Sequence, residues 1–111
     1  MTGKNHVLVN LYPVEVAEGY ESLFGVLQEA LNQAQFGKGH ERYAEPGKPF
    51  HAQDACREAR ELGLTTPIHK AREKAEEALH LDPNQAIDEL VGPINYLAAA
   101  VIVIEETKKK S

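Results

Sequence analysis

The sequence predicts a mainly α fold, a four-helix bundle-like domain with a short N-terminal β element. Apolar residues recur at offsets of three and four over several stretches, as on one face of a helix. Proline and glycine stand at the ends of these stretches, and only one short run is β-branched. Of 111 residues, 42% are apolar and 26% are charged. We therefore expect one globular domain over residues 1–111.

The β element is expected at residues 7–12, which are apolar and β-branched and stop at Pro13. A single strand cannot satisfy its own backbone groups. It therefore needs a second strand, either from nearby in the chain or from a symmetry-related copy.

The first helix is expected over residues 20–35, followed by a loop over residues 37–50. The helix has one apolar stripe, and Gly37 suits its end. The loop is rich in glycine and proline. The stripe consists of Tyr20, Leu23, Phe24, Leu27, Ala30, Leu31 and Ala34.

Three further helices are expected after the loop. One covers residues 51–62 and stops at Gly63. The next starts at Thr66-Pro67, with Thr66 as its N-cap. The last starts at Asp82-Pro83 and runs to about residue 107, with a kink or a second start at Gly92-Pro93. Its residues 96–104 are apolar all round, which favours burial in the core or against another subunit. The lone strand and this helix together predict a homo-oligomer.

Charge and cysteine content limit the classes of protein. The net charge is −5, which argues against general nucleic-acid binding. Residues 38–74 hold eight basic and six acidic residues, a net +2, so this middle part can still bind one small anion. A single cysteine and a polar start predict a cytoplasmic protein. The longest apolar run is about half of the ~20 residues that a membrane-spanning helix needs, so we expect no membrane association.

The loop and the helix after it are the first candidates for a ligand site. Glycines let a backbone approach a ligand, and basic side chains there can donate to phosphate or carboxylate. Aromatic side chains can stack on a base. The alternative is an ordinary solvated loop. The candidate ligand residues are Lys38, His40, Arg42, Tyr43, Phe50, Arg57 and Arg60.

Three other features have a structural and a functional interpretation. Asp54, Glu58 and Glu61 lie on one helix face and could hold Mg²⁺, or could be a solvated face. Cys56 lies on an apolar face and is expected in the core, the alternative being a nucleophile. Asn95, beside the apolar run, is expected to form a hydrogen bond in the core that fixes helix register, the alternative being a pocket residue.

Two resemblances suggest functions. Residues 89–98, Glu-Leu-Val-Gly-Pro-Ile-Asn-Tyr-Leu-Ala, resemble the second motif of the all-α, MazG-like nucleoside triphosphate pyrophosphohydrolases. Glu58-x-x-Glu61 could stand for the first motif of that family, which binds Mg²⁺. The aspartate expected near Gly92 is absent, so the metal would lack a ligand. Residues 37–53 and 89–106 also resemble small phage and prophage helical proteins, which implies a viral accessory protein.

We therefore expect a non-enzymatic binding protein for a small, nucleotide-like anion, without a cofactor. Together with the second resemblance, this suggests sequestration of a host signalling nucleotide. One alternative is a Mg²⁺-dependent nucleotide pyrophosphohydrolase with Asp54, Glu58 and Glu61 as metal ligands. Another is a protein-interaction module, such as an inhibitor of a host protein, with acidic ends that face a basic partner.

Overall fold

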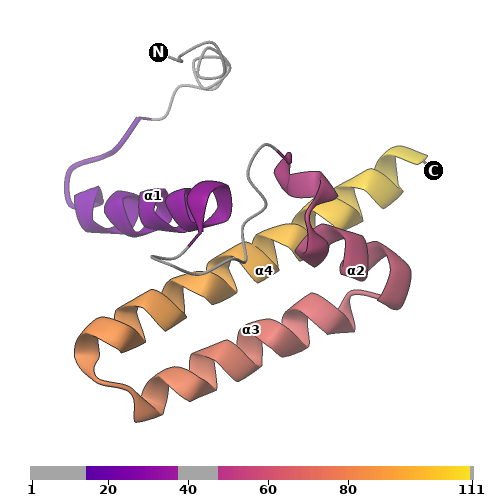
Figure 1. The fold of residues 1–111 in the computed structure, drawn as a ribbon. Helices are drawn as coiled ribbons and strands as arrows, with labels where there is room; N and C mark the ends of the chain where they lie inside the picture. Colours follow the sequence, from indigo (N-terminus) through magenta and orange to yellow (C-terminus); the bar gives the residue numbers. More distant parts are fainter. Residues whose placement is uncertain (1–14, 38–47, 111) are drawn as a thin grey trace.

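The computed structural model describes residues 15–37 and 48–110, and these residues are mainly helical (Figure 1). Two short 3-10 helices accompany the α-helices. In chain order the elements are α1 (Glu21–Phe36), η2 (Phe50–Ala52), α2 (Asp54–Leu62), α3 (Thr65–Glu77), η3 (Ala78–His80) and α4 (Pro83–Lys110). The mainly α prediction is confirmed. The predicted strand at residues 7–12 and most of the predicted loop lie outside the described residues.

Helix α4 is the central element, because α1, α2 and α3 each pack against it (Figure 1). The best-buried cluster lies between α2 and α4 and consists of Cys56, Ala59, Ala99 and Val103. The small residues in this cluster let the two helices approach closely. Phe50 and Leu64 pack against its edge. Cys56 is fully buried, as predicted, and burial raises the pKa of its thiol.

The starts of α3 and α4 can be compared with the capping residues and prolines that predicted them. The Asp82 carboxylate accepts a hydrogen bond from the backbone N–H of Gln85 at 3.0 Å, so it caps α4 as predicted. Thr66 is not the cap of α3, since Leu64 holds that position. Buried Pro67 lies within the first turn of α3, where its missing N–H costs nothing.

The helix predicted over residues 51–62 is divided at Gln53, which has an extended backbone. The side chain of Gln53 is buried and donates to the carbonyls of Lys48 and Ala34 at 3.1 and 3.4 Å. This amide therefore ties the start of α2 both to the segment before it and to the end of α1.

Of the two alternatives predicted at Gly92-Pro93, a kink or a second start, the second start is wrong, because α4 runs without a break from Pro83 to Lys110. Pro93 removes only one backbone donor, and packing of α4 against three helices supports the rest of the helix. Among the described residues, α4 is also the one helix long and apolar enough to cross a membrane by length and composition. Core helices of soluble proteins pass the same test.

Candidate functional site

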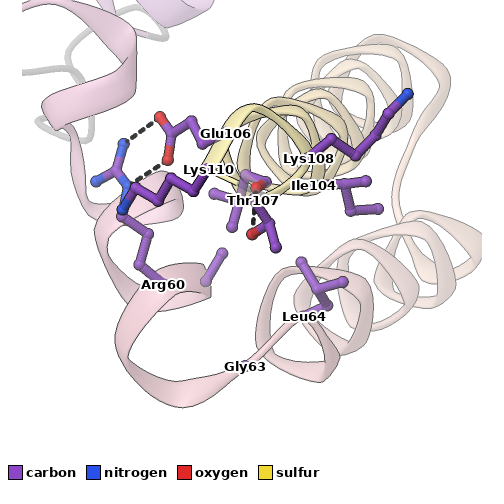
Figure 2. Close-up of a pocket in the computed structure, with 10 residues that line it drawn as sticks. Arg60, Gly63, Leu64, Ile104, Glu106, Thr107, Lys108 and Lys110 are labelled. Carbon is purple, nitrogen blue, oxygen red and sulfur yellow. Dashed lines mark hydrogen bonds and ion pairs between the residues drawn. The ribbon is translucent and has the colours of Figure 1, made fainter.

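A surface pocket of about 480 Å³ lies between the end of α2, the turn into α3 and the last turns of α4 (Figure 2). One wall is apolar and includes Leu64 and Ile104. The other side is charged and includes Arg60, Glu106 and Lys110. Figure 2 shows Lys110 extending on the side of Arg60, while Lys108 extends away on the side of Ile104.

Gly63 forms the turn that joins α2 to α3 beside this pocket. Its φ of 105° lies in the left-handed region, which side chains with a Cβ rarely adopt. Its N–H donates to the carbonyl of Ala59 at 3.1 Å and ends α2. The chain can therefore turn at once into α3, which brings Leu64 to the pocket.

Arg60 and Glu106 form the best-defined ion pair of the pocket (Figure 2). Arg60 Nε and Nη2 donate to the two carboxylate oxygens of Glu106 at 2.8 and 2.9 Å. These hydrogen bonds raise the pKa of the Arg60 guanidinium and lower the pKa of the Glu106 carboxyl, which nearby His51 and Lys110 also lower. Arg60 Nη2 also donates to the carbonyl of His51. The guanidinium thus links α4 to η2.

The structure brings only one of the described candidate ligand residues to this pocket. Arg60 lines it, whereas exposed Arg57 pairs with Asp54 at 2.6 Å, one turn earlier on α2. Half-buried Phe50 packs against the core cluster, so its ring supports the fold. Four candidates lie outside the described residues, namely Lys38, His40, Arg42 and Tyr43.

Two of the three acidic residues of α2 have basic partners. Asp54 pairs with Arg57, and Glu58 pairs with Lys70 of α3 at 2.7 Å. This hydrogen bond raises the pKa of Lys70. Glu61 is exposed. Within residues 15–37 and 48–110, no group of three or more acidic, histidine or cysteine side chains is placed to hold a metal ion.

Glu106, Lys110 and Leu64 are pocket residues that the sequence did not indicate. Glu106 lies 46 positions from Arg60, and no motif links the two. The three lysines after Glu106 were a visible basic group, but they also suit any helix C-terminus. Only the packing of α2 against α4 identifies the pair.

Comparison of the chain with models of known families, with characterised proteins and with solved structures finds no match.

Proposed function

We propose that this chain is a non-enzymatic binding protein for a small anionic, nucleotide-like ligand. One observation carries the proposal: two cationic side chains, Arg60 and Lys110, stand beside an apolar wall in a pocket of about 480 Å³. Guanidinium and ammonium groups pair with phosphate or carboxylate. An apolar wall suits the base of a nucleotide, and pockets of this size accept small molecules.

In this proposal, residues 38–43, which precede η2 in the chain, supply further ligand groups. The chain leads from that segment through Lys48 to His51, whose carbonyl binds Arg60. The segment therefore rejoins the described fold at a residue that contacts the pocket's arginine. The proposed phosphate contacts from the segment are Lys38, His40 and Arg42, and the proposed base contact is Tyr43.

The ion pair sets a condition on binding. Glu106 occupies the guanidinium fork of Arg60 with both of its oxygens. A phosphate that binds Arg60 must therefore exchange with Glu106, which would weaken the affinity. Glu106→Gln removes this competition, and we expect several-fold tighter binding in that variant.

The resemblance to small phage and prophage proteins gives this activity a biological setting. A viral accessory protein that holds a host signalling nucleotide without hydrolysing it would lower the nucleotide's free concentration. This role needs stoichiometric binding and no catalytic group, which is consistent with the basic partners of Asp54 and Glu58.

The test is one incubation of the protein with mono-, tri- and cyclic nucleotides and Mg²⁺, followed by filtration. Chromatography then identifies the nucleotides in the filtrate and in the denatured protein fraction. An intact nucleotide recovered from the protein supports the proposal. A new hydrolysis product would favour the pyrophosphohydrolase instead, and an unchanged panel would favour a protein-interaction module.

Variants then locate the site with the nucleotide found in the panel. Arg60→Ala and Arg42→Ala are each expected to lose most of the binding while the far-UV circular dichroism stays unchanged. Arg72→Ala is the matched control, because Arg72 is an exposed α3 residue that pairs with Glu76. Full affinity in both Arg60→Ala and Arg42→Ala would contradict the placement of the site.

A further inference from the structure

Helix α4 carries an exposed apolar seam in addition to its buried faces. The seam residues are spaced alternately by three and four, which is the heptad pattern of helices that pair side by side. Five of them are exposed, by 43–59%, although all are large and apolar. The seam consists of Ile87, Leu90, Ile94, Leu97, Val101 and Ile104.

The other faces of α4 already have partners within the chain. The buried residues Val91, Ala99, Ala100 and Val103 lie at different helical positions from the seam. Helices α1, α2 and α3 all pack against α4 (Figure 1). The heptad spacing therefore belongs to a face that the described fold leaves exposed.

Helix α1, which also packs against α4, carries exposed apolar residues of its own. Four of its apolar residues, Leu23, Val26, Leu27 and Leu31, are 46–54% exposed. Burial of exposed apolar side chains of this kind favours association by roughly 25 cal/mol per Å² of apolar surface removed from water.

We propose that two copies of this chain pair through their α4 seams in an antiparallel dimer. The seam is self-complementary in that direction. A two-fold axis between positions 95 and 96 places Ile87 opposite Ile104. The same axis places Leu90 opposite Val101 and Ile94 opposite Leu97, so that every layer is apolar. Such a self-complementary surface is what a symmetric dimer requires. Ile104, at one end of the seam, also lines the pocket of the proposed anion site, whereas Leu97 and Val101 lie outside that pocket.

The charges at the two ends of α4 select the antiparallel direction. Asp82 precedes the helix, and Lys108, Lys109 and Lys110 form its last turn. Antiparallel pairing brings the lysine end of one copy to the Asp82 end of the other. Parallel pairing would place lysines against lysines. Figure 2 shows Lys108 on the same side as Ile104, which is the direction in which the seam continues.

A second copy fits this surface better than a lipid bilayer does. Helix α4 is long and apolar enough to cross a membrane by length and composition, but three helices of the same chain pack against it. Charged helices also cover part of α4, and α3 joins it through the pair Lys74–Glu89.

Sedimentation velocity of the full chain at micromolar concentration tests the dimer. We expect the mass of two chains for the wild type and of one chain for Leu97→Glu. Leu62→Glu is the matched control and should remain a dimer, because Leu62 is 68% exposed on α2, outside the seam. A monomeric wild type, or a dimer that survives both Leu97→Glu and Val101→Glu, would overturn the proposal.

Disulfide trapping tests the direction of pairing without a disruptive charge. Antiparallel pairing predicts a cross-link when Leu90→Cys and Val101→Cys chains are mixed and oxidised, and little cross-link in either variant alone. Parallel pairing predicts the reverse. Cys56 is fully buried, and the wild-type chain provides its background. Flotation with phosphatidylcholine vesicles tests whether the seam binds a lipid bilayer instead. A wild-type chain that binds vesicles and does not dimerise would overturn the dimer and assign the seam to a membrane.

Discussion

Helix α1 and the unit formed by α2, α3 and α4 are held by different kinds of contact. Cys56 and Ala59 of α2 are buried against Ala99 and Val103 of α4. In α1, Ala30 is the one buried residue, and its apolar stripe is largely exposed. The α2–α4 contact therefore buries more apolar side chains than the α1 contact does.

Three side-chain amides attach α1 instead. Asn95 of α4 donates to the Ala30 carbonyl at 2.9 Å, and Gln33 donates to the Asp88 carbonyl at 3.4 Å. Gln53 donates to the carbonyl of Ala34. Such bonds fix the position of a helix but contribute only about 1 kcal/mol each. Helix α1 is therefore oriented by bonds within its own chain, while none of the described residues covers most of its apolar face.

The largest expected effect comes from placing the same charge in each region. Ala99 and Ala30 are both buried alanines, 0% and 3% exposed. Ala99→Glu forces a carboxylate into the best-buried cluster, and we expect a loss of about 3–5 kcal/mol in the free energy of unfolding. Ala30→Glu should release α1 but leave the cluster between α2 and α4 folded.

Circular dichroism and native-state hydrogen exchange distinguish these two outcomes. In Ala99→Glu, protection should fall throughout the described helices. In Ala30→Glu, protection should fall in α1 alone. Equal loss of protection in α2 and α4 in both variants would show that the described helices fold as one unit. The α1 contact would then not be separable from the α2–α4 contact.

The next effect concerns the amide that orients α1. Asn95→Ala removes the donor to the Ala30 carbonyl, and we expect the docking of α1 to weaken by about 1–2 kcal/mol. Exchange rates of the α1 amides measure this change. Asn84→Ala, at an exposed position in the first turn of α4, is the control and should leave α1 protected. Unchanged exchange in Asn95→Ala would mean that the bond is not needed for docking.

Periodicity predicted the helices well, but not which parts of their surfaces would be covered. The stripe of α1 and the helix stop at Gly37 were visible in the sequence. The spacing of Leu23, Leu27 and Leu31 is the same whether a neighbouring helix or another copy covers them. Asn95 was correctly expected to form a hydrogen bond, although its acceptor lies 65 positions away.

The candidate site was harder to predict, because its described part is made by long-range packing. Arg60 was singled out, but its partner Glu106 lies 46 positions later in the chain. Phe50 was expected at a ligand, and in the structure its half-buried ring packs against the core cluster. A single aromatic residue near a loop does not reveal which of these roles it has, because both use the same apolar ring.

The smallest expected effect concerns the pair Arg60–Glu106, which is partly exposed. The pKa of Glu106 is lowered from its usual 4.5 in the folded protein. The unfolded chain therefore binds the proton more readily, and the pair stabilises the fold above about pH 4.5. This contribution is lost as the pH falls through the lowered pKa. We expect Glu106→Gln to have a lower urea midpoint than the wild type at pH 7 and 5.5.

As the pH falls through the lowered pKa of Glu106, the two urea midpoints should converge, because the wild-type carboxyl becomes protonated as well. The other carboxylates titrate alike in both proteins and cancel in the difference. Glu105→Gln, at the exposed neighbouring position, controls for the loss of one charge on α4. A gap between Glu106→Gln and the wild type that persists unchanged to pH 3 would show that the side chain's packing, and not its charge, joins α4 to α2.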